Sequence, residues 1–173
     1  SKASFSRKVL RDLLGISGLR RYIGYFASAW GPNEKNLFGN LKHFFSKLYG
    51  FLICQLVIFS ALTFFGQAWL YLLLWWVPKL TVFSLFYRLR NIAEHACTSG
   101  EEDFTNTRTT LSSKWFKYFI APLNVNYHLE HHLFMFCPWY NLPLAHQMLR
   151  EKDFYKDLEI ENGYLNVFRK VII

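Results

Sequence analysis

The sequence predicts an all-α integral membrane protein, in which a transmembrane helical hairpin carries a cytosolic helical cap with a histidine-rich metal site. Three observations predict this class. Aromatic residues make up 20% of the 173 residues and hydrophobic residues 52%, so the chain is far more aromatic than an ordinary globular protein. No charged residue lies between Lys47 and Lys79. Four of the six histidines fall within residues 124–146.

The basic charge of the chain first suggests a nucleic-acid-binding protein, since the formal net charge is +8. The distribution of that charge argues against this function. Lysine and arginine flank the long apolar run and do not form a stripe along a polar face, which is the pattern of the cytosolic loops of a membrane protein. The sequence therefore predicts membrane lipid as a partner and excludes nucleic acid.

Residues 1–48 predict basic helices at a membrane surface. Apolar residues between Val9 and Ile16 fall close to helical spacing, and glycines interrupt the pattern, so we expect one short helix followed by a second. An ordinary solvated helix fits the same pattern. Residues 31–33, Gly-Pro-Asn, indicate a turn, and His43 lies in an aromatic segment where an interface residue is expected more than a ligand.

Residues 49–87 predict the transmembrane hairpin. One continuous helix over residues 49–77 would be roughly 43 Å long, which exceeds a hydrocarbon core of about 30 Å. Gly66 and Gln67 divide the region into two spans, residues 49–65 and residues 68–86. Basic residues lie before the first span and directly after the second, so both ends face the cytosol. Lys79 follows Pro78 and must reach the interface or a polar cavity, while the proline gives a reason for a local kink.

The metal site is predicted from the segment NVNYHLEHHLFMFCPWYNLPLAH. His128, His131 and His132 have the spacing i, i+3, i+4, which places three imidazoles on one face of a helix. Neutral imidazole suits zinc, copper, iron and nickel alike, so the ligand type leaves the metal open. His146 follows in a different register, after two prolines, and a structural role is equally compatible with its position.

Residues 88–173 predict the cytosolic cap, and a second pair of ligands opens it. Asn91 and His95 stand four residues apart on one helical face. The only apolar patch in residues 100–127 is too short to span a bilayer, so His95 and the histidine cluster lie on the same side of the membrane. Two histidine-bearing segments can then share one metal centre.

Other residues of the cap have predicted supporting roles. Asp103 and Arg108 can orient a ligating imidazole from the polar loop over residues 100–113. Asn141 can cap a helix that begins at Leu142, and the mixed charges of the tail suggest a peripheral helix. Three cysteines without metal-binding or disulfide spacing are expected to be packing residues: Cys54, Cys97 and Cys137.

The motifs NxxxH at residues 91–95 and HxxHH at residues 128–132, preceded by a membrane hairpin, resemble those of the membrane-bound di-iron fatty acid desaturases. The likeness is closest to the bacterial acyl-lipid type, through RLRNIAEHA and NVNYHLEHHLFMFCPWYNLP. It covers essentially the whole chain, but only the C-terminal portion of the family pattern, without the first two histidine boxes. The resemblance implies that the chain is part of a longer desaturase and is inactive by itself.

The resemblance also implies the ligands and the partners. His95, His128, His131 and His132 correspond to ligands of two iron ions (Fe2+), and Asn91 to an asparagine that meets iron through a water. Glu130 lies between ligands and can orient them. The implied reaction is the O2-dependent introduction of a double bond into a fatty acyl lipid or an acyl thioester. The implied electron donor is ferredoxin or cytochrome b5, and the implied location is the bacterial inner membrane in preference to the endoplasmic reticulum.

Three alternatives remain open. The same scaffold serves di-iron hydroxylases and ketolases that act on carotenoids, sterols or sphingolipids, and a fold does not decide the reaction outcome. A non-catalytic membrane protein whose histidines bind zinc would carry the same cluster. A decayed desaturase without activity would bind no metal and form no product.

Overall fold

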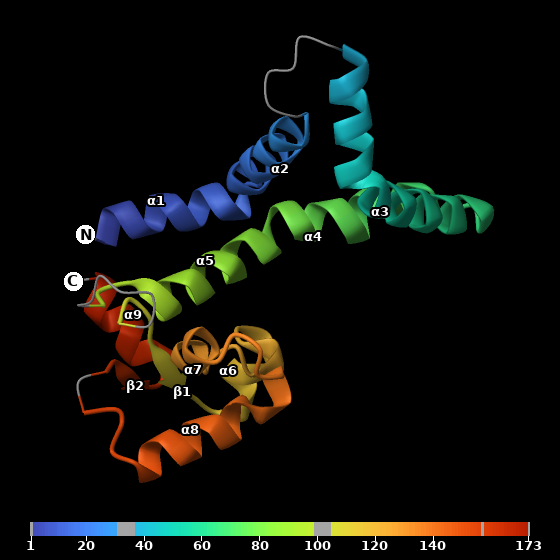
Figure 1. Cartoon of the computed structure of the whole chain (residues 1–173). Helices are drawn as coiled ribbons and strands as arrows, with labels where there is room; N and C mark the ends of the chain where they lie inside the picture. Colours follow the sequence, from blue (N-terminus) through green and yellow to red (C-terminus); the bar gives the residue numbers. More distant parts are fainter. Residues whose placement is uncertain (1, 31–36, 99–104, 157, 173) are drawn as a thin grey trace. The chain divides into compact units, whose positions relative to one another are not determined.

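A computed structural model describes residues 2–30, 37–98, 105–156 and 158–172 (Figure 1). The described chain is mostly helical, as the sequence predicts. It divides into two compact units: residues 7–85 form one, and residues 86–173 together with residues 1–6 form the other. The first contains the long apolar helices and the second contains the histidine cluster, so each is described by itself.

Two helices precede the apolar region, as predicted: α1 (Lys2–Leu13) and α2 (Ile16–Ala29). Gly15 separates them with φ +77°, a left-handed conformation that glycine adopts without steric cost. Gly18 of α2 packs directly against the backbone of Leu80, where an added Cβ would lie 2.3 Å from the Leu80 carbonyl oxygen. A side chain at residue 18 therefore has no room.

The apolar region folds as two helical stretches with a break at Gly66, where the sequence predicts the hairpin turn. Helix α3 (Leu37–Phe64) begins well before the expected start at Tyr49, because the helical pattern continues through the aromatic segment around His43. Gly66 has φ +70°, which ends the helix. The second stretch consists of a π-helical turn η1 (Tyr71–Trp76), α4 (Val77–Leu80) and α5 (Val82–His95). The turn precedes Pro78, whose missing N–H disturbs the helix there.

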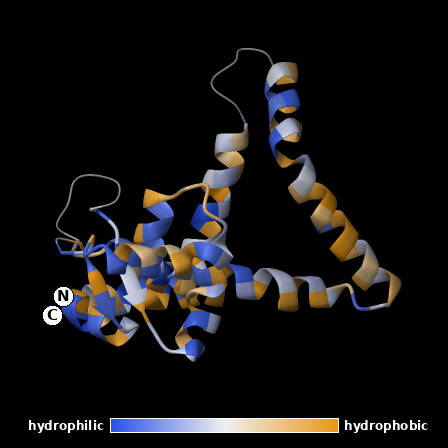
Figure 2. Cartoon of the chain, turned by 60° about the horizontal axis from the view of Figure 1, so that its bottom comes forward, coloured by the Kyte–Doolittle hydropathy of each residue, from blue (hydrophilic) through white to orange (hydrophobic). Residues whose placement is uncertain are grey.

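Both stretches, Leu37–Phe64 and Tyr71–His95, are long and apolar enough to cross a membrane, judged by length and composition. Only 6% of the residues in the most apolar window of each are buried, so neither is the core helix of a globular protein. Figure 2 shows the hydrophobic residues of α3 concentrated in its C-terminal half. Exposed side chains of this apolarity are stable only against another apolar medium.

Polar groups within this unit find partners close by. Gln55 of α3 accepts hydrogen bonds from the Tyr71 hydroxyl at 2.8 Å and the Trp75 indole N–H at 2.9 Å, which ties the two stretches together. The Lys79 ammonium lies 4.1 Å from the centre of the Trp75 ring, a cation–π contact that the sequence did not predict. His43 contacts the Ala29 carbonyl oxygen through Nδ1 at 3.0 Å, so it joins α2 to α3.

The second unit corrects the all-α prediction, because it contains a short parallel pair of strands. Strand β1 (Thr109–Leu111) pairs with β2 (Ile160–Asn162), in the register Thr109 to Ile160. Three-residue strands leave almost no alternation of polar and apolar residues, so periodicity could not reveal them. The other elements are α6 (Lys114–Phe119), η2 (Pro122–Asn124), α7 (His128–Leu133), η3 (Trp139–Asn141), α8 (Leu142–Glu151) and α9 (Tyr164–Ile172).

The core of this unit is small. One cluster of buried apolar residues joins α5, the residues after α6, and α9, and consists of Ala93, Ile120, Ala121, Tyr164 and Val167. Helix α8 begins at Leu142 as predicted, but Asn141 makes no side-chain capping hydrogen bond, so its predicted role as a cap is wrong. The prediction of packed cysteines is also wrong for Cys54 and Cys97, which are exposed. Cysteine is small enough to remain at a surface without cost.

Candidate metal centre

Three of the predicted ligands converge in the structure: His95, His128 and His132. His95 is the last residue of α5, whereas His128 and His132 lie one turn apart on α7. The Nε2 atom of His128 is 3.0 Å from that of His95 and 3.2 Å from that of His132. One nitrogen from each residue lies within 4.8 Å of the others.

The spacing of these nitrogens fits a shared metal ion. Two imidazole nitrogens bound to one metal at about 2.1 Å lie about 3.0 Å apart when they are at right angles, and about 3.4 Å apart in a tetrahedral arrangement. The two measured separations, 3.0 and 3.2 Å, fall in this range. A nitrogen-only donor set suits first-row transition metals, iron included, and disfavours calcium and magnesium.

The environment keeps the central imidazole neutral. Burial, together with like-charge repulsion from the neighbouring His132 and His95, lowers the pKa of His128 from 6.5 to about 3. A neutral imidazole has a free lone pair, and only that form binds a metal. His128 is therefore ready to act as a ligand throughout the physiological pH range.

The second ring nitrogen of His95 fixes its orientation. Nδ1 lies 3.0 Å from the Asn106 carbonyl oxygen, which can only accept, so Nδ1 carries the hydrogen and Nε2 presents its lone pair to the cluster. Such a hydrogen bond from the far nitrogen is the usual way in which proteins orient a metal-binding imidazole. Nothing in the sequence points to Asn106, since a backbone carbonyl carries no residue signature.

The sequence predicts that Arg108 orients a ligating imidazole, but in the structure its guanidinium binds backbone carbonyls close to His95 in the chain. Its guanidinium is buried and reaches the Ala93 carbonyl oxygen at 3.5 Å, the Cys97 carbonyl oxygen at 3.4 Å and the Glu159 carboxylate at 3.4 Å. The Ala93 carbonyl lies in the last turn of α5 and the Cys97 carbonyl lies just after the helix, so the two stand on either side of His95 in the chain. Arg108 thereby holds the helix end that presents the ligand. Asp103, the other residue predicted for this role, lies outside the described residues.

His128 also faces a carboxylate that the sequence reasoning missed. The Nδ1 atom of His128 is 3.9 Å from Glu94 Oε1, and the same oxygen accepts a 2.5 Å hydrogen bond from Arg90. A carboxylate opposite the metal-facing nitrogen is a common arrangement around ligating histidines. The sequence does contain a sign of this carboxylate, because Arg90 and Glu94 are four residues apart on one helix and Glu94 directly precedes His95.

Two predicted ligands lie outside the converging group. His131 is exposed on α7, and its ring centre is 5.9 Å from that of His128 and of His132. It borders a cavity of about 240 Å³ that is also lined by His128 and Arg90. Asn91 is exposed on α5, one turn before His95. The three converging imidazoles can hold one metal ion, so a second ion would need His131, Asn91 and further ligands.

Glu130 and His146 lie together behind the histidine cluster. Glu130 is completely buried on α7, and its Oε1 lies 2.6 Å from Nδ1 of His146 and accepts a 2.5 Å hydrogen bond from the Tyr155 hydroxyl. Its Oε2 accepts a hydrogen bond from the Thr109 hydroxyl. Burial raises the pKa of Tyr155, and the hydrogen bond to Glu130 raises it further, so the phenol stays a donor. Glu130 is therefore held by side chains from other segments of the chain, and His146 is one of them.

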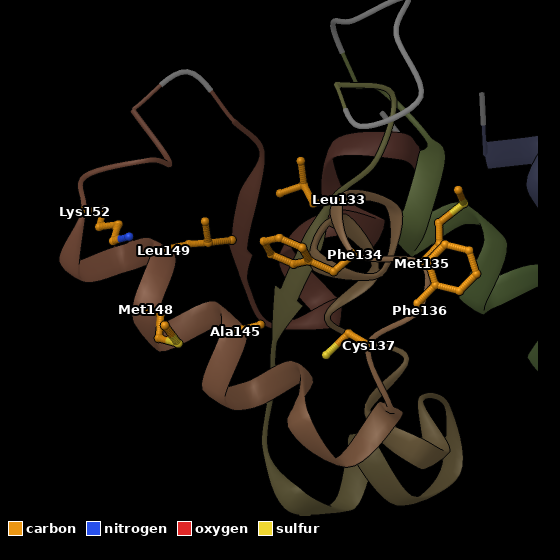
Figure 3. Close-up of a pocket in the computed structure, with 9 residues that line it drawn as sticks. All are labelled: Leu133, Phe134, Met135, Phe136, Cys137, Ala145, Met148, Leu149 and Lys152. Atoms are coloured by element: carbon orange, nitrogen blue, oxygen red, sulfur yellow. The ribbon is translucent and has the colours of Figure 1, made fainter.

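An apolar groove of about 640 Å³ borders the segment that follows the cluster (Figure 3). One wall is the segment Leu133–Cys137, and the other is formed by Ala145, Met148 and Leu149 of α8 and by Lys152 directly after it. Phe134 points toward Leu149 across the groove in Figure 3. Together with the apolar helices, this surface indicates a protein that handles hydrophobic molecules or contacts a hydrophobic medium.

Comparisons with known proteins agree with the motifs and the geometry. The family model described as fatty acid desaturase matches residues 1–160, which is most of the chain. No curated protein and no solved structure gives a match. The match covers the apolar helices, Asn91 and His95, and the HxxHH motif on α7. The chain therefore belongs to the fatty acid desaturase family.

Proposed function

We propose that this chain is the C-terminal part of an O2-dependent di-iron desaturase that introduces a double bond into a fatty acyl chain. Membership of the family places it among oxidoreductases of the desaturase and hydroxylase type. The single observation that carries the finer proposal is the convergence of three imidazole nitrogens, from two helices, directly after an apolar helix. The desaturases of the bacterial acyl-lipid type carry the same motifs.

In this proposal His95, His128 and His132 hold one iron. His131, which lies beside His128 and His132 on α7, and Asn91, one turn before His95 on α5, contribute to a second iron, Asn91 through a water. The two irons need more ligands than these five residues supply, and histidine boxes encoded upstream would provide them. When bound, the irons supply the oxidising power that removes hydrogen from an unactivated methylene.

The contribution of the protein is orientation. The Asn106 carbonyl fixes the tautomer of His95, and Arg108 holds the end of the helix that carries it. The low pKa of His128 keeps its lone pair free. These groups hold the nitrogens in place before the metal arrives, so less ordering is required on binding.

The apolar helices give the substrate its route. In this proposal Leu37–Phe64 and the first part of Tyr71–His95 cross the bacterial inner membrane as a hairpin, which presents the histidine cluster on the cytosolic side. A fatty acyl lipid or acyl thioester would then bring its acyl chain to the site from the lipid. Ferredoxin or cytochrome b5 would supply electrons, and the basic residues of the chain can dock an acidic donor.

Elemental analysis tests the metal. A polypeptide that carries this chain together with its upstream histidine boxes is purified in detergent, and iron and zinc per chain are measured. We expect close to two irons, and His128→Ala should remove most of them because this imidazole contacts both neighbours. His43→Ala is the matched control, because the His43 imidazole contacts the Ala29 carbonyl oxygen of α2 and is not one of the proposed ligands, so the iron content should stay unchanged.

Lipid analysis of a host that expresses the same polypeptide tests the reaction. A new double bond that disappears in His128→Ala is the expected result. A new hydroxyl group would assign the chain to the hydroxylases of the same scaffold. Zinc without iron, and no product, would show a structural metal site and overturn the proposal.

A further inference from the structure

The buried carboxylate of Glu130 lies on the opposite side of α7 from the metal-facing imidazoles. Successive residues of a helix turn by about 100°, so His128 and His132 share one face and Glu130 lies roughly half a turn away. Helix α7 contains six residues. A helix this short has too few internal hydrogen bonds to fix its own orientation. Its orientation must come from contacts with the rest of the cap.

Glu130 makes those contacts with three separate segments. Thr109 is the first residue of β1, His146 lies on α8, and Tyr155 follows α8. An ionised carboxylate has about four acceptor positions, so three donors use most of its capacity. All three hydrogen bonds are made by the Glu130 carboxylate, which is fully buried. Hydrogen bonds to a buried carboxylate are strong, and their loss is costly.

His146 is part of this arrangement and not a ligand of the converging group. Its Nδ1 donates to Glu130, and its ring lies between Tyr127 and Tyr155, with ring centres 5.3 and 5.0 Å away. Tyr127 directly precedes α7, so the His146 ring braces the start of the helix as well as the carboxylate within it. The aromatic contacts fix the ring plane, which fixes the direction of its N–H.

We propose that Glu130, held by Thr109, His146 and Tyr155, is a positioning residue for the metal centre: it sets the rotation of α7 about its own axis and thereby aims His128 and His132 at His95. The inference rests on the proposed function, because it assigns a metal to these imidazoles. A rotation of α7 would move both nitrogens in the same direction, away from His95. Loss of the carboxylate should therefore weaken metal binding without removing any ligand.

Titration with Co2+ alone tests the proposal, since its visible absorption reports the number and arrangement of ligands. The protein is the detergent-purified polypeptide with its upstream boxes. Glu130→Gln keeps the shape of the side chain but replaces one acceptor by an NH2 group. We expect Co2+ affinity to fall 10- to 100-fold, the usual range for losing a partner behind the ligands, together with a changed absorption spectrum.

Two further variants separate positioning from general destabilisation. Val167→Ala opens a cavity in the apolar cluster with Ala93 and Tyr164 without touching the Glu130 hydrogen bonds, and should lower the melting temperature while Co2+ affinity and spectrum stay as in the wild type. Tyr155→Phe removes one donor with little change in volume, and we expect a smaller loss of affinity, about threefold. When Tyr155→Phe is combined with Glu130→Gln, the Co2+ affinity should fall almost no further than in Glu130→Gln alone, because both changes act through one carboxylate.

The outcomes are distinct. Wild-type affinity and spectrum in Glu130→Gln would overturn this inference and leave the proposed function intact. An equal loss of affinity in Val167→Ala would also overturn it, since stability alone would then explain the effect. A wild-type protein that binds neither Co2+ nor iron would overturn the proposed function and this inference together.

Discussion

Within residues 7–85 the large apolar side chains are mostly exposed, whereas within residues 86–173 many polar and charged side chains are buried. Leu56, Phe64 and Trp69 are more than half exposed in the first unit. Arg108, Asn126 and Glu130 are almost completely buried in the second. One aromatic-rich chain thus contains two units of opposite character. The first exposes apolar side chains that an apolar surrounding would stabilise, and the second buries polar side chains that specific hydrogen bonds stabilise.

Among the changes that test this contrast, Arg108→Ala in the cap should have the largest effect on stability. The change leaves two helix-end carbonyls and the Glu159 carboxylate without their buried partner. We expect a loss of about 3–5 kcal/mol in the free energy of unfolding, measured by denaturation in detergent. Lys156→Ala is the control, because its pair with Asp153 is exposed and should contribute less than about 1 kcal/mol. Equal losses in both variants would contradict the view that buried polar contacts stabilise the cap.

Leu56→Arg tests the medium around the apolar helices. Leu56 is 65% exposed in the apolar C-terminal half of α3, near the middle of the expected span over residues 49–65, and an arginine at the centre of a membrane helix costs about 3 kcal/mol on insertion. We expect a clear fall in the fraction of protein recovered in washed membranes. Leu165→Arg on α9 changes a residue of similar exposure, 58%, in the cap and should leave membrane recovery unchanged. Full membrane recovery of Leu56→Arg would mean that α3 does not lie in lipid.

Gly18→Ala tests how the helices of the first unit pack. The added methyl group would meet the Leu80 backbone, which cannot move aside cheaply, so we expect a loss of about 1–3 kcal/mol. Gly24→Ala lies on the same helix with open space around it and should stabilise by about 0.5–1 kcal/mol through its higher helix propensity. Thermal melts in detergent measure both, and a neutral Gly18→Ala would contradict the close contact.

The smallest effect is a pH dependence in the metal-free cap. The pKa of His128 is about 3 in the folded chain and 6.5 when unfolded, so between these values the unfolded chain binds more protons and stability falls as pH falls. Lowering the pH from 7 to 5.5 should cost about 1 kcal/mol through this residue. His128→Asn should reduce the slope of melting temperature against pH over this interval. An unchanged slope would contradict burial as the cause of the low pKa.

The sequence predicted the parts of the molecule that depend on local patterns. The break at Gly66 follows from a glycine that divides the apolar run, and the start of α8 at Leu142 follows from Asn141 and Pro143, residue types that favour a helix start. The meeting of His95 with the HxxHH helix follows from the lack of a bilayer-spanning run between them in the sequence. It could not predict Asn106 as the partner of His95, because a backbone carbonyl looks the same in every residue. It also missed the strand pair and the contacts of His146, since these join segments far apart in the chain.

The strand pair has a consequence for the order of folding. Thr109 pairs with Ile160, about 50 residues along the chain, and the segment between them includes α7 and α8. Closing a loop of this length costs entropy before its contacts stabilise it, so such pairings form slowly, whereas helices and a hairpin turn form from neighbouring residues. The apolar helices can therefore be in place while the cap is still open. Because α7 lies within this segment, we expect His128 and His132 to reach His95 only late in folding.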